Sequence, residues 1–269
     1  MSAESPRRRW ARAYARLRRT EGRGAGGEAE LLALPYLFSG PLAAQWAIRG
    51  RTFDALKTRV VVPLAKERAR GLAVLDLGAG NGWLCARLAR DGHRCVALDL
   101  RVDDVDGLAT GAAFRRHLPR MFGRVCASFD ALPFSDALFD LVVFDASLHL
   151  AEHLGNALAE AARATAAGGR VAILDSPFYA SAASGEAMAE EKRRETARIF
   201  RDLAGDLLAL TPVEYLTREI LGRAAAPAGL SFEKSRVRYP LSYETRVWKA
   251  RLLGRREPSR FDLWVARRA

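Results

Sequence analysis

Three glycines and two acids form the part of this chain best suited to hold a ligand. Asp76 is followed by Gly78, Gly80 and Gly82, and Asp99 stands 17 residues after the last of these glycines. Glycines allow a backbone turn to approach a ligand closely, and an acid at the end of the next strand can accept hydrogen bonds from ribose hydroxyls. The pattern therefore predicts a cradle for a nucleoside-containing cofactor.

Other cofactor and metal chemistries lack their motifs in this sequence. A dinucleotide fingerprint would need a third glycine where Trp83 stands, and no Gly-Lys-Ser/Thr follows the turn as a P-loop would require. There is no His-Glu-x-x-His motif, no Gly-x-Ser-x-Gly nucleophile elbow and no Asn-Pro-Pro-Tyr signature of amino-methylating nucleic-acid enzymes. The cysteines, Cys85, Cys95 and Cys126, have no metal-ligand spacing, so we expect buried thiols and no metal site.

The glycine turn must be positioned by a strand before it and a helix after it, and the sequence has this alternation. Apolar runs predict strands at 72–77, 94–99, 124–128, 139–145 and 170–175, with amphipathic helices at 82–91, 103–117 and 152–167 between them. Two further strands are expected at about 230–238 and 260–266. Strands that alternate with helices form parallel sheets covered on both faces. We expect an α/β fold with a doubly wound, mostly parallel, seven-stranded sheet.

Helical segments surround this predicted sheet. Residues 1–70 are expected to form a basic N-terminal helix and a helical cap over the mouth of the site, and residues 71–269 the cofactor-binding domain, with a helical insertion at about 177–225. Thr52 is expected to cap a helix that continues to about Arg70 and is kinked near Pro63. The insertion could select an acceptor or cover the sheet edge. The side chains expected either in the cap or in the core are Tyr36, Phe38, Trp46 and Arg49.

The net charge of +12 is concentrated at the two ends of the chain. The first 20 residues carry seven arginines and one acid, and residues 234–269 carry eleven basic and three acidic residues. Trp10, Tyr14 and Leu17 are at helical spacing among the first arginines. This basic helix could bind RNA or anionic lipid, but we expect it to pack on its own domain. No apolar run is long enough for a transmembrane segment or a secretory signal, so a cytoplasmic protein is expected.

Four motifs in order make this chain resemble the class I S-adenosylmethionine-dependent methyltransferases, in particular their small-molecule, type 11-like branch. The motifs cover roughly residues 72–176: Val74-Leu-Asp-Leu-Gly-Ala-Gly-Asn-Gly82, Ala97-Leu-Asp99, Ser128-Phe-Asp-Ala-Leu-Pro-Phe134 with Phe139-Asp-Leu-Val-Val143, and Ser147-Leu-His149 before a helix ending in Gly168-Gly169. The resemblance implies a Rossmann-like methyltransferase fold, with S-adenosylmethionine as cofactor and S-adenosylhomocysteine as product. It also implies methyl transfer to an O, N or C atom of a small or medium acceptor, such as a lipid-linked, glycan or secondary-metabolite hydroxyl.

The resemblance also assigns the cofactor site. Asp76 would lie near the positive groups of the cofactor and Asp99 would bind its ribose. Relatives usually have an acid four residues before Leu132, where this chain has Ser128, so either Ser128 or Asp130 would accept from the adenine amino group. The expected cofactor-binding residues are Asp76, Leu77, Gly78, Ala79, Gly80, Asn81, Gly82, Asp99, Leu100, Ser128, Phe129, Asp130, Asp145 and Ala146.

His149 and Asp145 are the candidate catalytic residues. His149 is the ionisable group of its loop with an ordinary pKa near neutrality, and it would act as a general base or pack at the start of a helix. Asp145 would act as a base or position the acceptor. Two other functions remain as alternatives: an RNA methyltransferase that uses the basic termini for the phosphate backbone, or a non-catalytic protein that only binds S-adenosylmethionine.

Overall fold

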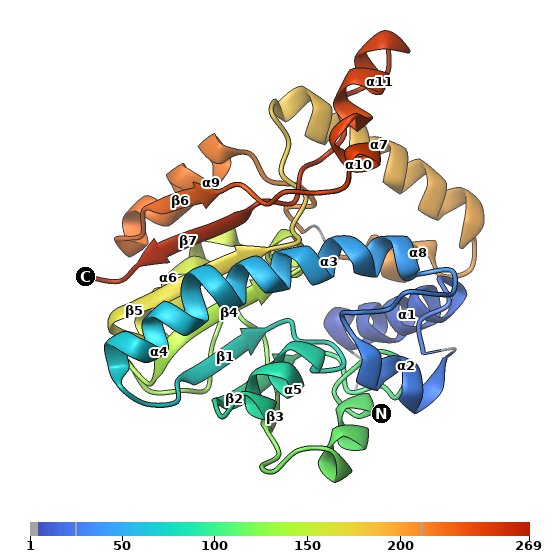
Figure 1. The fold of residues 1–269 in the computed structure, drawn as a ribbon. Coiled ribbons are helices and arrows are strands. Elements are labelled where there is room, and N and C mark those ends of the chain that lie inside the picture. Colours follow the sequence, from blue (N-terminus) through green and yellow to red (C-terminus); the bar gives the residue numbers. More distant parts are fainter. Residues whose placement is uncertain (1–4, 25, 211) are drawn as a thin grey trace.

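The computed structural model describes residues 5–24, 26–210 and 212–269, and these form one seven-stranded sheet in the order β3-β2-β1-β4-β5-β7-β6 (Figure 1). The first five strands are parallel and β7 is antiparallel to both of its neighbours. The strands are β1 (Ala73–Leu77), β2 (Arg94–Asp99), β3 (Gly123–Cys126), β4 (Phe139–Asp145), β5 (Thr165–Leu174), β6 (Phe232–Ser235) and β7 (Leu263–Arg267). The predicted mostly parallel, seven-stranded sheet is confirmed.

Both faces of the sheet are covered by helices. On one face Val74 and Val143 pack in a cluster with side chains of α5 (Trp83–Arg90), α3 (Ala43–Leu56) and α4 (Val62–Arg68). On the other face Leu75 and Phe144 pack with α6 (Leu154–Ala164) and α9 (Arg218–Ala225). The central strands are apolar on both sides because neither side meets water, which is why they are continuous apolar runs in the sequence.

The helix predicted over 103–117 is wrong. These residues form turns and a short 3-10 helix, η2 (Thr110–Arg116). The carboxylate of Asp103 accepts hydrogen bonds from the backbone amides of Val105 and Asp106 at 3.1 and 3.0 Å. An aspartate that binds amides two and three residues ahead stabilises a turn in competition with a helix.

Thr52 is not a helix cap, because it lies in the third turn of α3. Its hydroxyl instead donates to Asp175 at 2.7 Å. The predicted continuation of the helix past Pro63 is confirmed: α3 continues through a π-helical turn, η1 (Lys57–Val61), into α4, which has Pro63 in its first turn and ends at Arg68. Proline has no amide hydrogen to donate, so the irregular turn lies where a regular bond would be missing.

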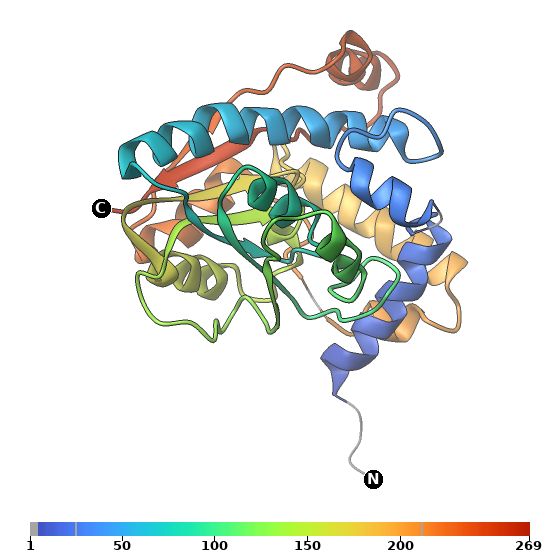
Figure 2. The ribbon, with the colours of Figure 1, turned by 60° about the horizontal axis from the view of Figure 1, so that its bottom comes forward.

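The other helices lie around the carboxyl ends of the strands or project from the body. Helix α1 (Pro6–Thr20) lies beside α8 (Ala204–Leu207), with α2 (Gly27–Ala33) and α7 (Ala182–Ile199) nearby (Figures 1 and 2). Residues 177–225 contain α7, α8 and α9, and the last of these packs against α6. Helices α10 (Leu241–Glu244) and α11 (Arg246–Leu252) precede β7, and η3 (Leu148–Leu150) and η4 (Ala226–Ala228) are short 3-10 turns. Within the described ranges, no helix has the length and apolar character needed to cross a bilayer.

Candidate functional site

The glycine turn after β1 is fixed by β2. The amides of Gly78 and Ala79 donate to the carbonyl of Leu98 at 2.8 and 3.0 Å, and the amide of Gly80 donates to Asp99 Oδ2 at 2.7 Å. All three glycines of the turn have positive φ, and a Cβ on Gly78 would stand 2.4 Å from Cβ of Ser147. Only glycine combines this backbone conformation with this close approach.

A pocket opens at the carboxyl ends of β1, β2 and β4, next to this turn. It encloses about 980 Å³, its open mouth included. The structure brings eleven of the predicted cofactor residues into its lining: Gly78, Ala79, Gly80, Asn81, Asp99, Leu100, Ser128, Phe129, Asp130, Asp145 and Ala146. We call this the cofactor pocket. Three predicted residues, Asp76, Leu77 and Gly82, are outside the lining.

Asp76 lies on β1, directly before the turn, and is 1% exposed. Burial, together with the charges of Asp145 and Asp99, raises the pKa of Asp76 well above its ordinary value. Its Oδ1 has no hydrogen-bond partner among the residues that the structure describes. A buried carboxylate oxygen of this kind is an acceptor without a donor.

Ser128 and Asp130 form a small turn at the edge of the pocket. The Ser128 hydroxyl donates to Asp130 Oδ2 at 3.1 Å and accepts from the Asp130 amide at 3.2 Å. Asp130 Oδ1 is buried and has no hydrogen-bond partner within the described part of the chain. Burial raises the pKa of Asp130. The acceptor left open in this turn is therefore an oxygen of Asp130, while the serine hydroxyl is already engaged.

Helix α1 forms one wall of the cofactor pocket. Trp10, Tyr14 and Arg18 line the pocket, and the Trp10 and Tyr14 rings stack with their centroids 4.8 Å apart. Arg7 binds Glu152 at 2.8 Å and lies 3.7 Å from Asp130 Oδ2. The helix therefore packs on its own domain, as expected, with its aromatic face toward the pocket.

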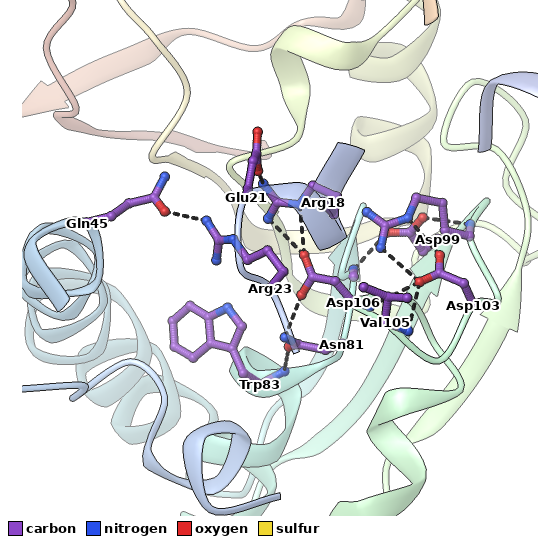
Figure 3. A network of polar contacts seen from close by, with 12 residues as sticks. Arg18, Glu21, Arg23, Gln45, Asn81, Trp83, Asp99, Asp103, Val105 and Asp106 are labelled. Atoms are coloured by element: carbon purple, nitrogen blue, oxygen red, sulfur yellow. Dashed lines mark hydrogen bonds and ion pairs between the residues drawn. The ribbon is translucent and has the colours of Figure 1, made fainter. Parts of the chain in front are cut away.

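Asp106 connects α1 to the glycine turn (Figure 3). Arg18 donates to Asp106 Oδ2 from Nε and Nη2 at 2.9 and 2.8 Å. The other carboxylate oxygen of Asp106 accepts from the Asn81 amide nitrogen at 2.9 Å, and Asn81 Oδ1 accepts from the Trp83 backbone amide at 3.1 Å. The chain of contacts therefore runs from α1 to the first residue of α5, and we call it the Arg18 latch.

A second pocket adjoins the cofactor pocket and encloses about 760 Å³ with its mouth. The two share Tyr14, Arg18, Arg49 and Ala146. The second pocket is further lined by Arg23, Gln45, Ile48, His149, Asp175, Pro177 and Phe261. His149 therefore lies in the lining of the second pocket and outside that of the cofactor pocket. Burial lowers the pKa of His149 to about 3, so its imidazole is neutral at physiological pH.

Arg49 stands between two acids at the boundary of the pockets. Its Nη2 donates to Asp145 Oδ2 at 2.6 Å, and its Nε lies 3.5 Å from Asp175 Oδ2. Its guanidinium carbon is 4.4 Å from the centroid of the Trp46 ring. Burial and the neighbouring charge of Asp145 raise the pKa of Asp175 to about 7.

Asp175 is absent from the site residues predicted by sequence, although a signal for it exists. It directly follows β5, just as Asp99 ends β2 and Asp145 ends β4, and parallel strands bring their carboxyl ends to one edge of a sheet. Of the predicted cap residues, Trp46 and Arg49 line the cofactor pocket. Tyr36 instead donates to Asp54 at 2.6 Å, and Phe38 is 90% exposed.

None of the three cysteines is among the residues that line the two pockets. Cys85 and Cys95 are buried free thiols, whereas Cys126, expected to be buried, is exposed at the end of β3, where the strand lies at the sheet edge. Over the described residues, no group of three or more histidine, cysteine or acidic side chains is arranged to hold a metal ion.

Comparison with known proteins supplies relatives for the central part of the chain. Residues 75–173 match a family model described as a methyltransferase domain. Demethylmenaquinone methyltransferase of Mycobacterium tuberculosis is 33% identical over 150 residues, which cover 56% of this chain and 59% of the relative. Malonyl-[acyl-carrier protein] O-methyltransferase of Erwinia pyrifoliae is 35% identical over 100 residues, which cover 37% of this chain and 36% of the relative. The matched region thus spans little more than half of the first relative, and less of the second.

Solved structures share the fold at low sequence identity. The 1,6-didemethyltoxoflavin-N1-methyltransferase of Burkholderia thailandensis, solved with bound 1,6-didemethyltoxoflavin and S-adenosylhomocysteine, has a TM-score of 0.50 and 19% identity, covering 80% of this chain and 79% of that one. The [4+2]-cyclase SpnF has a TM-score of 0.54 and 19% identity, covering 81% and 80%. These similarities establish the fold. The reaction must be inferred from the residues of the site, because one fold can support different functions.

Proposed function

We propose that this chain, whose residues 75–173 match a methyltransferase domain, is a class I S-adenosylmethionine-dependent methyltransferase and transfers a methyl group from S-adenosylmethionine to a small-molecule acceptor. One observation carries this proposal. The pocket beside the glycine turn, where Asp99 binds the Gly80 amide, adjoins a second pocket that has its own acid, Asp175. The first pocket is suited to the cofactor and the second to the acceptor.

The residues of the cofactor pocket fit S-adenosylmethionine. Asp76 lies just outside the lining, but its Oδ1 has no partner and would accept from a positive group of the cofactor, whose charge would favour the ionised carboxylate. The N-terminus of α5, which follows the turn, suits the carboxylate of the cofactor. Asp99 keeps lone pairs for the ribose hydroxyls after accepting from two backbone amides. Asp130 Oδ1, and not Ser128, is the acceptor we assign to the adenine amino group. The bound cofactor would supply an electrophilic methyl group on its sulfonium.

We assign the proton-accepting role in the second pocket to Asp175. A general base works best when its pKa lies near the working pH, and Asp175 has a pKa of about 7. His149, with a pKa of about 3, is too weak a base and instead offers a neutral hydrogen-bonding group to the acceptor. Asp145, bound to Arg49, holds the guanidinium in place between the pockets. Alignment of the acceptor with the methyl group would supply most of the remaining rate enhancement.

The relatives support a small-molecule acceptor and not a nucleic acid. By their names they act on demethylmenaquinone, malonyl-[acyl-carrier protein] and 1,6-didemethyltoxoflavin. Four arginines of α1 that a polyanion would need, Arg7, Arg9, Arg16 and Arg18, instead form ion pairs with acids of this chain. We therefore favour a small molecule over RNA as the methyl acceptor.

A [4+2]-cyclase shares this fold, so the fold alone does not establish methyl transfer. The test therefore measures cofactor binding and methyl transfer separately. S-Adenosylhomocysteine binding is measured by calorimetry, and transfer of a tritiated methyl group is measured against a fractionated small-molecule extract. Asp99→Ala should weaken cofactor binding about 10- to 100-fold, since a hydrogen bond to a charged group contributes about 1.5–3 kcal/mol. Asp136→Ala, on the exposed loop before β4, is the matched control.

Each outcome bears on one of the candidate functions. Wild-type affinity in Asp99→Ala would overturn the cofactor site. Tight binding of S-adenosylhomocysteine by the wild type without a labelled product in any fraction would favour the non-catalytic reading. Label transferred to RNA, in a salt-sensitive manner, would replace the small molecule as acceptor.

A further inference from the structure

Helices α10 and α11 present a row of large apolar side chains to solvent. Leu241, Trp248, Leu252 and Leu253 are 82%, 80%, 87% and 62% exposed, and we call them the outer face of α10–α11. Figure 1 shows α11 projecting from the body of the molecule. Single exposed apolar residues are ordinary, but four large apolar side chains exposed in and directly after two neighbouring short helices indicate an interaction surface.

The opposite face of the same helices is firmly packed. Tyr243 and Val247 are buried, and the Tyr243 hydroxyl accepts from the Phe261 amide at 3.2 Å. The Arg246 guanidinium lies 3.7 Å from the centroid of the Tyr243 ring and donates to the Ser259 carbonyl at 2.9 Å. The orientation of α10–α11 is therefore fixed from within, so the exposure of the outer face is a consequence of the fold.

Basic side chains lie beside the outer face. Lys249, Arg251 and Arg255 are exposed. Arg251 lies 3.6 Å from Glu257, whereas Lys249 and Arg255 have no ion-pair partner among the residues that the structure describes. Tryptophan and leucine with flanking cations match the surface of an anionic membrane, where the apolar groups enter the headgroup region and the cations bind lipid phosphates.

We propose that the outer face of α10–α11 binds the surface of a membrane that contains anionic lipids. Trp248 and Leu252, one helical turn apart, enter the boundary between headgroups and acyl chains, and Lys249 and Arg255 contact the headgroups. Phe261, which Tyr243 and Tyr239 bind through its backbone amide and carbonyl, also lines the second pocket. Membrane contact would therefore take place next to the acceptor side of the site. The proposal goes beyond methyl transfer and does not depend on it.

The experiment uses the full chain without cofactor. Sedimentation is measured with vesicles of phosphatidylcholine alone and with vesicles of phosphatidylcholine and phosphatidylglycerol in equal parts. We expect binding to the anionic vesicles, weaker binding in high salt, and at least about a tenfold loss of partitioning in Trp248→Ser/Leu252→Ser, because two large apolar groups lose their burial. Phe38→Ser removes a side chain that is 90% exposed elsewhere and is the matched control.

A second measurement follows the indole itself. Anionic vesicles should shift the tryptophan emission to the blue in the wild type but not in the folded Trp248→Phe variant. The proposal is overturned if the protein binds neither vesicle, or if the double variant binds as the wild type does. A dimer in sedimentation velocity that dissociates in Trp248→Ser, without vesicle binding, would assign the face to a second copy of this chain and would also overturn it.

Discussion

The cofactor pocket and the second pocket lie side by side at one edge of the sheet, but they are held in different ways. The glycine turn of the first is fixed by backbone hydrogen bonds to Leu98 and by the Asp99 carboxylate, all within residues 78–99. The second is fixed by side chains from distant segments, with Arg49 of α3 between Asp145 and Asp175. The glycine turn of the cofactor pocket is therefore held mainly by backbone hydrogen bonds, whereas the second pocket is held by ion pairs between buried side chains.

This difference has a physical consequence. Backbone amides keep the same charge at every pH, so the hydrogen bonds of the turn to Leu98 are insensitive to proton concentration, and only its contact with Asp99 involves a titratable group. Buried carboxylates depend strongly on their neighbours and on pH, because the low dielectric strengthens each interaction. The comparison predicts that the second pocket responds to charge substitutions and to pH, whereas the first responds to steric change in the turn.

The largest effect is expected from Asp175→Asn. Loss of a general base lowers kcat by about 10²- to 10⁴-fold. In the wild type, activity should rise as the pH increases through about 7, because Asp175 must lose its proton to act as a base. The variant should lack this rise, and a merely structural role would not remove it.

The control for this variant is His149→Gln, which should keep the rise with pH because His149 stays neutral over the same range. S-Adenosylhomocysteine affinity should change little in either variant, since neither side chain lines the cofactor pocket. If the pH dependence follows His149 instead, the assignment of the base is reversed.

Removal of Arg49 should destabilise the protein by about 3–5 kcal/mol, the usual cost of leaving buried partners of an ion pair without compensation. Arg49→Leu leaves Asp145 and Asp175 facing each other. Because Arg49 lowers the pKa of Asp175, its loss leaves that pKa further above the unfolded value, so the free energy of unfolding should fall further as pH rises from 5 to 8. Urea unfolding at the two pH values measures this.

The matched control is Arg194→Leu, which removes an exposed i,i+4 pair with Glu190 and should change the free energy of unfolding by no more than about 0.5 kcal/mol. Equal effects of the two variants, or a loss in Arg49→Leu that does not grow with pH, would contradict a pocket built on buried charge.

The sequence predicts the cofactor pocket better than the second pocket. Strands β2 and β4 have the predicted bounds, because buried parallel strands are apolar throughout, and the glycine turn is readable because its ligating groups are contiguous. The pairing of Arg49 with Asp175 joins residues far apart in the chain, so no local pattern encodes it. The two basic helices illustrate the same limit. Helix α1 turns its aromatic face toward a pocket, whereas α11 exposes Trp248 and Leu252, and sequence alone does not show which, because the packing partners are distant.

Gly78→Ala tests the glycine turn. The substitution should lower the free energy of unfolding by about 2–4 kcal/mol and abolish S-adenosylhomocysteine binding. About 1 kcal/mol comes from the left-handed backbone and the rest from the approach to Ser147 at 2.4 Å. Gly92→Ala is the control, because Gly92 also has positive φ but no atom within 4 Å of its Cβ. Equal costs at both positions would mean that close packing does not define the turn.

Arg18→Met should have the smallest effect and should show whether the two pockets act together. Arg18 lines both pockets and holds Asp106 in the Arg18 latch, so its loss should weaken S-adenosylhomocysteine binding about 3- to 10-fold, less than the loss of a direct charged hydrogen bond because Arg18 acts on the turn through Asp106 and Asn81. Arg16→Met removes an exposed contact of the same helix with Asp202 and should leave binding unchanged. Because α1 is a shared wall, Arg18→Met should also raise the KM of the acceptor. A change confined to cofactor affinity would mean that the pockets are independent, with the latch serving only the glycine turn.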